Sequence, residues 1–187
     1  MTNFDSEANI KEKFDENNLA SGHALETINL ELRPIDKSDL AAYVRLLTEP
    51  AVMKFVGLEA GYIPSQAEIE QIVDRAVAAW QTRGYGRWSL YLRETGEFAG
   101  FCGFRCERGR PELICLLHEK FWGRGLAPEA ARACLEYGFE QLAFTEVQAF
   151  TRAGNRQAHR MLEKLGAKFV GHVDFYGVEG DFYLLKP

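Results

Sequence analysis

The chain is poor in cysteine, and the cysteines that it has are widely spaced. Cys102, Cys106, Cys115 and Cys134 contain no C-x-x-C pair. Zinc sites use closer pairs of Cys or His ligands, and oxidised disulfide frameworks are typical of secreted chains. We therefore expect no metal site, and reduced thiols in the core of a cytoplasmic protein.

Long apolar runs and an excess of basic residues are also missing. No run approaches the roughly 18–20 apolar residues of a membrane helix, and the N-terminus lacks the basic-then-apolar pattern of a secretory signal. The 187 residues include 22 Lys and Arg against 27 Asp and Glu, a net charge of −5. Proteins that wrap nucleic acid present a basic face. We therefore expect neither a nucleic acid nor a membrane as a partner.

The negative charge is concentrated at the start of the chain. Residues 1–27 carry a net charge of −4, and the rest of the chain carries −1. This stretch is polar and poor in aromatic residues, which is typical of a mobile segment. The sequence therefore predicts a flexible acidic tail over residues 1–27 and one folded domain over residues 28–187.

Residues 28–187 alternate between strand-like and helix-like patterns, in the predicted order β-α-α-β-β-β-α-β-α-β-β. Three strands near residues 87–93, 98–104 and 112–118, joined by short turns, predict an antiparallel meander. The segment from Glu112 to Thr151 reads strand, helix, strand, which predicts two parallel neighbours with a right-handed crossover. The fold class is therefore α/β, with a mixed sheet that is mostly antiparallel and flanked by helices.

Local signals mark several element boundaries. Ser65 and Glu68 have the spacing of a capping box at the start of a helix, and Pro50 is expected to stop the helix before it. Gly100 and Gly103 within a strand indicate a bulge or a close backbone approach.

The segment Gly123–Ala127 lies between a strand and a helix. Its glycines allow a sharp turn, and the helix N-terminus adds unpaired N–H groups and a positive dipole. These features suit a phosphate or pyrophosphate, although a plain strand-to-helix turn has the same pattern. A Walker loop would need Gly-Lys-Ser/Thr, and a dinucleotide fingerprint would need a third small residue where Pro128 stands. Both of those nucleotide motifs are therefore disfavoured.

Two segments resemble a known family. Glu112-Leu113-Ile114, followed by Phe121 to Ala130, resembles motif A of the GNAT N-acyltransferases in the form of the RimJ/RimL-like branch. Asn155-Arg156-Gln157-Ala158, followed by Leu162 to Ala167, resembles motif B. The likeness runs from about residue 28 to the end of the chain and implies a GNAT-like fold with one splayed parallel strand pair.

The resemblance implies an N-acetyltransferase that uses acetyl-CoA, without a metal. An amine, from a protein N-terminus or a small molecule, would attack the thioester directly in a ternary complex. The backbone of Leu117 and His118 would pair with the pantetheine, and Asn155 would hydrogen-bond to it. The residues expected at the pyrophosphate are Gly123, Arg124, Gly125, Leu126 and Ala127.

Glu112 matches the family's acid in this strand, and we expect it to act as the general base through a water. A surface carboxylate is the alternative interpretation. Ala158 and Leu162 stand where motif B often carries a hydroxyl or phenol, so a non-catalytic acyl-CoA-binding module stays open as a second function. A nucleotide-binding protein of another family is a third. Glu59, Glu179 and Asp181 would suit a cationic acceptor if they face the cleft. A homodimer is the default assembly.

Overall fold

The computed structural model describes residues 23–57 and 59–187. Its centre is one eight-stranded sheet in the order β1-β2-β3-β4-β5-β6-β8-β7. The strands are β1 (Leu25–Glu26), β2 (Leu30–Pro34), β3 (Arg87–Leu92), β4 (Phe98–Glu107), β5 (Arg110–Leu117), β6 (Val147–Arg152), β7 (Lys168–Phe175) and β8 (Val178–Leu185). The helices are η1 (Lys37–Asp39), α2 (Leu40–Leu47), α3 (Pro50–Met53), α4 (Gln66–Arg83), η2 (Glu119–Phe121), α5 (Leu126–Glu140) and α6 (Arg156–Lys164). The predicted mixed α/β class is confirmed.

Strands β3, β4 and β5 form the expected antiparallel meander. A Cβ on Gly100 would lie 2.1 Å from the backbone oxygen of Leu116 on β5, and the register of β3 with β4 shifts between Leu90 and Tyr91. The register shift is the expected bulge, and the short distance at Gly100 is the expected close backbone approach, which leaves no room for a side chain there.

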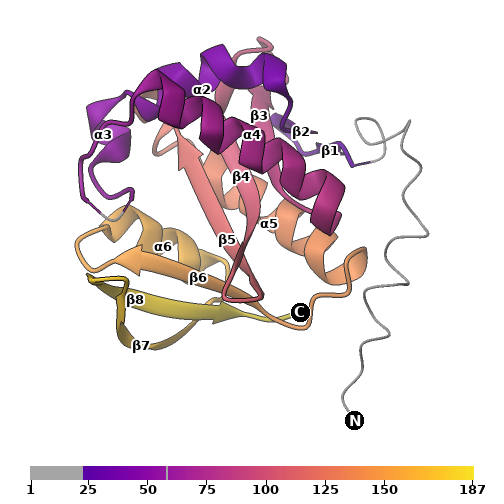
Figure 1. Cartoon of the computed structure of the whole chain (residues 1–187). Coiled ribbons are helices and arrows are strands. Elements are labelled where there is room, and N and C mark those ends of the chain that lie inside the picture. Colours follow the sequence, from indigo (N-terminus) through magenta and orange to yellow (C-terminus); the bar gives the residue numbers. More distant parts are fainter. Residues whose placement is uncertain (1–22, 58) are drawn as a thin grey trace.

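Strands β5 and β6 are parallel, as predicted, but they are paired only where they begin. Glu112 faces Gln148, and this is their single register pair. Beyond that pair the two strands diverge in Figure 1, and β6 pairs along its whole length with β8 on its other side. The sheet is therefore continuous on both flanks and open in its middle.

Helices cover the two faces of the sheet. Figure 1 shows α4 crossing in front of the strands and α5 behind them. Trp88 of β3 packs edge-on against Tyr137 of α5, whereas Phe101 of β4 stacks on Tyr43 of α2. Because side chains of a strand alternate between faces, the α2 face also carries Gly103 and Arg105 of β4.

The ends of several elements differ from the prediction. Leu25–Glu26 pairs with β2, and the backbone oxygen of His23 accepts a hydrogen bond from Trp88 Nε1. Leu25–Glu26, which falls within the expected tail, is therefore a strand of the sheet, and residues 1–22 lie outside the described residues. Helix α2 ends at Leu47, before Pro50 as expected. Pro50 then starts the short helix α3. Proline is tolerated there because the N–H of the first helical residue has no acceptor within the helix.

The capping box at the start of α4 is present. Ser65 Oγ accepts from the backbone of Glu68, and the Glu68 carboxylate accepts from the backbone N–H of Ser65. This pairing satisfies donors that the first helical turn otherwise leaves unbonded. Among the described helices, none is long and apolar enough to cross a membrane.

Candidate active site

A cavity of about 430 Å³ lies where β5 and β6 part. Helix α6 lines it with Ala158, Met161 and Leu162, and the N-cap residue Asn155 lines it too. The segment Phe55–Gly57 after α3 and the β7–β8 turn at Phe175 and Tyr176 also line it.

This cavity reaches both faces of the sheet. Ala149 of β6 pairs with Tyr183, whose hydroxyl lies 2.9 Å from His159 Nδ1 on α6. The next residue, Phe150, points the other way and stacks on Phe175. Ala149 and Phe150 both line the cavity. Two ligands can therefore meet inside the sheet, one from each face.

The edge of β5 offers unpaired backbone to the cavity. His118 donates its N–H to Ala99 of β4 at 3.0 Å, and every second residue of an antiparallel strand bonds to the same neighbour. The backbone groups of Cys115 and Leu117 therefore point toward the gap. An extended ligand can pair with them as an added strand does.

The expected role of His118 needs a correction. Its N–H is used by Ala99, and its backbone oxygen accepts from Phe121 at 3.0 Å. The Leu117 oxygen accepts from Trp122 Nε1 at 2.9 Å, which leaves the Leu117 N–H for a ligand. The His118 ring instead holds Glu49, with 2.7 Å between Nδ1 and Oε2. This residue joins the end of β5 to the α2–α3 connection.

Gly123–Ala127 has the geometry of an anion cradle. Gly123 and Gly125 have φ angles of 75° and 80°, a region that side chains with a Cβ avoid. Gly125 is the N-cap of α5, and Pro128 contributes no N–H. Among the described residues, no backbone oxygen accepts from the N–H groups of residues 123–127. Free N–H groups at the positive end of a 15-residue helix suit a pyrophosphate.

Arg124 lies beside the cradle, and Asn155 lies in the cavity at the N-terminus of α6. Arg124 is exposed beside the cradle, with its guanidinium carbon 5.5 Å from the Phe121 ring centroid. Asn155 caps α6, because its Oδ1 accepts from Ala158 N at 3.2 Å. The capping oxygen is therefore committed to the helix, and the amide nitrogen is the group that Asn155 can offer to a ligand in the cavity.

Glu112 is a buried cavity carboxylate, not a surface one. Its exposed fraction is 2%. Arg105 Nη2 donates to its Oε1 at 2.8 Å, and no described residue hydrogen-bonds to Oε2. Burial raises the pKa of Glu112, and the charge and hydrogen bond of Arg105 oppose that rise. A carboxylate with one free oxygen and a raised pKa is equipped to accept a proton.

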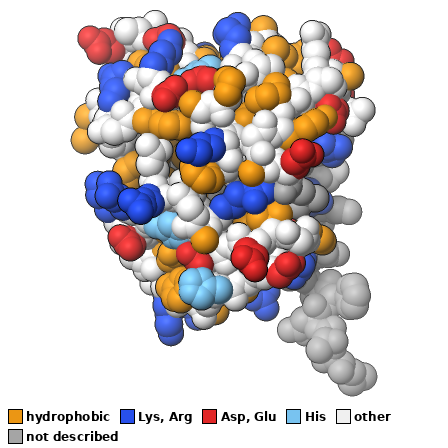
Figure 2. All heavy atoms as spheres, turned by 90° about the vertical axis from the view of Figure 1, so that its left-hand side faces the viewer, with side chains coloured by type: hydrophobic (Ala, Val, Ile, Leu, Met, Phe, Trp, Pro, Cys, Tyr) orange, Lys and Arg blue, Asp and Glu red, His pale blue; other side chains and the backbone are white. Residues whose placement is uncertain are grey.

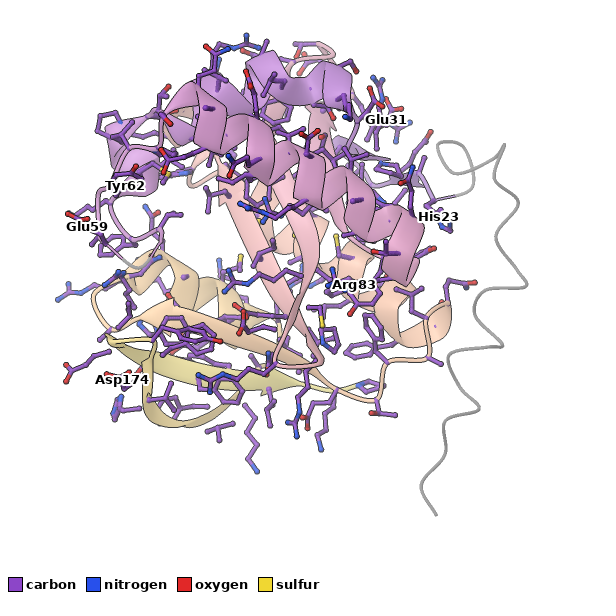
Figure 3. The ribbon with its side chains drawn as sticks, viewed as in Figure 1. His23, Glu31, Glu59, Tyr62, Arg83 and Asp174 are labelled. Carbon is purple, nitrogen blue, oxygen red and sulfur yellow. The ribbon has the colours of Figure 1, made fainter. Side chains whose placement is uncertain are left out.

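The three acids considered for a cationic acceptor do not surround the cavity. Glu59 and Glu179 are exposed, and Figure 3 shows Glu59 at the outer edge of the loop between α3 and α4. Asp181 is buried on the α6 side, where it lies 2.5 Å from His172 Nδ1 and 3.4 Å from His159 Nε2. These acids therefore give no support to a cationic acceptor.

Arg105 is a site residue that the sequence pattern missed. It lies opposite Glu112 in the β4–β5 register. From the sequence alone, a charged residue near the end of β4 is expected to be exposed to solvent. Only the register, which follows from the hairpin between β4 and β5, brings the guanidinium to the buried carboxylate.

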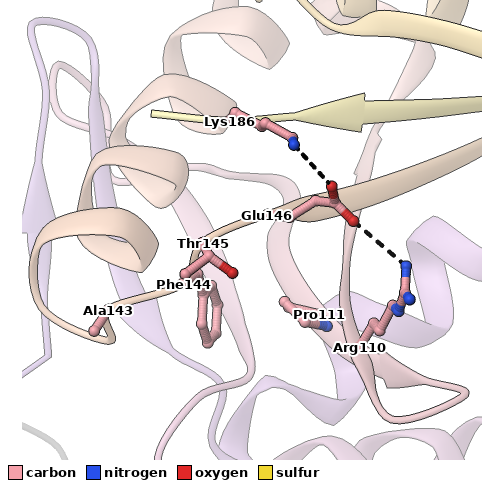
Figure 4. Close-up of a pocket in the computed structure, with 7 residues that line it drawn as sticks. All are labelled: Arg110, Pro111, Ala143, Phe144, Thr145, Glu146 and Lys186. Carbon is pink, nitrogen blue, oxygen red and sulfur yellow. Dashed lines mark hydrogen bonds and ion pairs between the residues drawn. The ribbon is translucent and has the colours of Figure 1, made fainter.

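A second hollow lies at the start of β5, lined by Arg110 and Pro111. Figure 4 shows that it is crossed by two ion pairs of Glu146, to Arg110 and to Lys186, each 3.4 Å long. Its lining is polar and its charges are already paired, so it lacks the unpaired groups of the cavity between β5 and β6.

The cysteines and other potential ligands gather into no metal centre. All four cysteines are free, and Cys102 and Cys134 are buried. Within residues 23–57 and 59–187, no group of three or more His, Cys, Asp or Glu side chains is placed to hold a metal ion.

A mixed sheet that opens beside a helix N-terminus can accommodate an extended anionic ligand. Residues 29–168 match the family described as the acetyltransferase (GNAT) domain. The N-acetyltransferase p20 of Bacillus licheniformis is 30% identical over 146 residues, which are 75% of this chain and 80% of p20. The chain therefore belongs to the GNAT acetyltransferase family, as its motifs predicted.

Other proteins and structures are similar to this chain. The YkkB protein of Bacillus subtilis is 31% identical over 156 residues, which are 78% of this chain and 85% of YkkB. An acetyltransferase structure from Agrobacterium tumefaciens has a TM-score of 0.77 at 27% identity and covers 88% of this chain and 94% of its own. RimL, a ribosomal L7/L12 acetyltransferase solved with coenzyme A, shares the fold with a TM-score of 0.74 at 18% identity, covering 87% of this chain and 97% of its own.

Proposed function

We propose that this protein transfers an acetyl group from acetyl-CoA to a primary amine, on a small molecule or a protein N-terminus, by direct attack in a ternary complex. The observation that carries the proposal is the cavity through the sheet. It brings the unpaired edge of β5 and the buried Glu112 carboxylate to one place. Acetyl-CoA supplies the acetyl group as a thioester, which is activated toward amines.

Three groups of this chain fit the donor. The N–H groups of Gly123–Ala127 hold the pyrophosphate, with Arg124 beside them. The Leu117 N–H pairs with the pantetheine in the manner of an added strand. The Asn155 amide nitrogen donates to the same arm from α6.

Glu112 removes the proton that the attacking amine must lose, through a water. Its free oxygen Oε2 and its raised pKa support this role. The ion pair with Arg105 fixes the orientation of the carboxylate. A thiol with a pKa of about 8.5 leaves readily, so the mechanism needs no side-chain acid at Ala158 or Leu162.

Two measurements test the proposal. Calorimetric titration with acetyl-CoA is expected to show binding that weakens when Arg124 is changed to Gln. The control is Arg83→Gln, at the exposed end of α4 away from the cradle (Figure 3). Release of CoA thiol with a panel of primary amines is expected to exceed the hydrolysis background. Binding without amine-dependent release would instead support a non-catalytic acyl-CoA-binding module.

A further inference from the structure

The cavity between β5 and β6 has a wall of its own on the α2 face of the sheet. Glu112 of β5 pairs with Arg105 of β4, which lies on that face, and paired residues of neighbouring strands share a face. Side chains alternate along a strand, so Ile114 and Leu116 point the same way as Glu112. Helix α5, whose N-terminus is expected to hold the pyrophosphate of the donor, covers the opposite face (Figure 1). The α2 face is therefore left for the acceptor.

Aromatic rings continue this wall on β6 and at the β7–β8 turn. Phe150 of β6 and Phe175 of β7 stack on each other, with 4.9 Å between the ring centroids and 25° between the ring planes. The Tyr176 ring meets Phe175 edge-on, also with 4.9 Å between centroids. All three rings line the cavity, and Phe150 and Phe175 are only half-buried. These three residues form an aromatic platform that leaves ring surface open to a ligand.

The loop after α3 adds another apolar wall. Phe55 lines the cavity with a half-buried ring. Arg152 of β6 donates to the Gly57 backbone oxygen at 2.8 Å, which ties this loop to the strand that carries Phe150. Pockets for small ligands are mostly apolar and aromatic, with a few polar groups that fix the orientation of the ligand. The rings and the free oxygen of Glu112 give this face that composition.

The charges around the aromatic platform do not suit an acceptor with a second positive charge. The Arg108 guanidinium carbon lies 5.0 Å from the Phe175 ring centroid, and Arg105 lines the cavity itself. The two described acids in the cavity lining are both engaged. Glu112 is paired with Arg105 through one oxygen, and Glu107 accepts from the tyrosine hydroxyl of the platform at 3.2 Å. A polyamine would therefore find little compensation for its further charges here.

The outer surface has the same character. Figure 2 presents the side of the molecule on which α3 and the β7–β8 turn lie in Figure 1. Hydrophobic side chains lie across the middle of this face next to Lys and Arg side chains, and acidic side chains lie above and below. The middle of the face is therefore apolar and cationic, not acidic.

The strand register sets the distance between the aromatic platform and the carboxylate. Glu112 is opposite Gln148, and Phe150 lies two residues further along β6 on the same face. Two residues of a strand span about 6.6 Å. A ring that packs on the platform can therefore carry an amino group to the neighbourhood of Glu112 on a chain of two or three carbon atoms.

We propose that the aromatic platform binds the apolar body of the acceptor, so that the preferred acceptor is a small amine carried by a short chain on an aromatic ring. The ring packs against Phe150 and Phe175 on the α2 face, and the amino group extends toward the free oxygen of Glu112. This inference rests on the proposed function, because it names the substrate class of the same site. It also replaces the expectation of a cationic acceptor.

The test compares amines that differ in the body attached to the amino group, with the full-length protein and acetyl-CoA. Phenethylamine carries an aromatic ring, cyclohexylethylamine keeps its bulk without aromaticity, and butylamine has a short chain alone. Putrescine adds a second positive charge to butylamine. From CoA thiol release, kcat/KM for phenethylamine is expected to exceed that for butylamine at least roughly tenfold, as apolar pockets discriminate. Putrescine is expected to be the slowest, and cyclohexylethylamine to lie between phenethylamine and butylamine.

Variants assign the preference to the aromatic platform. Phe150→Leu and Phe175→Leu remove a ring but keep an apolar side chain, and each is expected to lower kcat/KM for phenethylamine by roughly tenfold, through KM. The value for butylamine is expected to stay in place. Phe169→Leu is the matched control, because its ring is exposed on β7 and lies outside the cavity lining. This control is expected to keep the preference for phenethylamine.

A further variant tests the platform even if the leucine variants are unstable. Tyr176 has a φ of 55°, which glycine adopts without strain. Tyr176→Gly therefore removes the third ring without a backbone cost. It is expected to lower kcat/KM for phenethylamine and to leave that for butylamine in place.

The outcomes separate the two proposals. Calorimetry on the protein loaded with CoA measures amine binding without the reaction. Tighter binding of phenethylamine than of butylamine, without amine-dependent thiol release, supports the platform and overturns the proposed transfer reaction. Release that is equal for phenethylamine and butylamine, or a preference that survives the loss of the platform rings, overturns the platform and leaves the transfer reaction standing. A value for cyclohexylethylamine equal to that for phenethylamine overturns the preference for an aromatic body.

Discussion

Strand β5 has a neighbour on each side, and the two pairings differ. On one side, β4 pairs with it at every position from Gly100 opposite Leu117 to Glu107 opposite Arg110. On the other side, β6 pairs with it at Glu112 and Gln148 alone. The closed side places backbone against backbone so tightly that Gly100 admits no side chain, whereas the open side leaves a cavity. Stability is therefore expected to depend on the first side and ligand binding on the second.

The largest expected effect is on the open side, at Glu112. Glu112→Gln removes the proton acceptor and is expected to lower kcat by roughly 10²–10⁴-fold, the usual contribution of a general base. Acetyl-CoA binding, measured by calorimetry, is expected to stay unchanged. Glu107→Gln is the matched control, since it changes another cavity carboxylate that is less buried. Equal losses in the two variants would contradict the role of Glu112.

The same variant has a consequence for stability. Folding raises the pKa of Glu112, so the folded state binds its proton more tightly than the unfolded state does. Stability from this group is present at low pH and is lost as pH rises through the raised pKa. Glutamine does not ionise, so Glu112→Gln is expected to lack this loss of stability at high pH. Above neutral pH its melting temperature is expected to equal or exceed that of the parent protein.

On the closed side, we expect a cost in stability. Gly100→Ala places a Cβ against the Leu116 oxygen at a φ of 148°, and is expected to destabilise the fold by about 3 kcal/mol or more. Urea unfolding measures this. The contrasting variant is Ala158→Leu, whose added atoms enter the cavity. It is expected to change stability by less than about 1 kcal/mol while weakening acetyl-CoA binding. Similar stabilities for the two variants would contradict the comparison.

The helix cradle gives a smaller and more specific effect. Gly125→Ala strains a φ of 80°, and Gly96→Ala in the β3–β4 turn strains a φ of 69°. A Cβ would meet no atom within 4 Å at either position, so both are expected to cost about 1–2 kcal/mol of stability. Only Gly125→Ala is expected to weaken acetyl-CoA binding, by roughly tenfold, because it alone displaces N–H groups at a helix start. Unchanged affinity in Gly125→Ala would remove the cradle from the site.

The smallest expected effect is a shift in the pH profile. Arg105 holds the pKa of Glu112 down, so Arg105→Gln is expected to raise that pKa. The base must be ionised, and activity is therefore lost as pH falls through this pKa. The acid limb of kcat/KM is expected to move to higher pH in the variant. Arg110→Gln, which breaks the exposed pair with Glu146 at the start of β5, should leave the limb in place, because Arg110 is not among the groups that shift the pKa of Glu112. A profile unchanged in Arg105→Gln would exclude this coupling.

Much of the fold follows from local sequence signals. The capping box of Ser65 and Glu68, the strand glycines at positions 100 and 103 and the glycines that precede α5 each act through their own backbone geometry or that of near neighbours. These signals needed no tertiary information. The predicted tail over residues 1–27 includes Leu25–Glu26, which pairs with β2, and this long-range pairing leaves no local sequence signal.

The sequence by itself determined the mixed α/β class, the motifs of the family and the candidate carboxylate Glu112. Only the tertiary structure decided what those residues face. The register of β4 with β5 gives Glu112 its partner Arg105, and the alternation of the β5 backbone turns His118 away from the gap. The physical reason is that strand pairing joins residues that are distant in sequence. The ion-pair partner of Glu112, the burial of its carboxylate and the direction of the β5 backbone hydrogen bonds are therefore set by the assembled sheet.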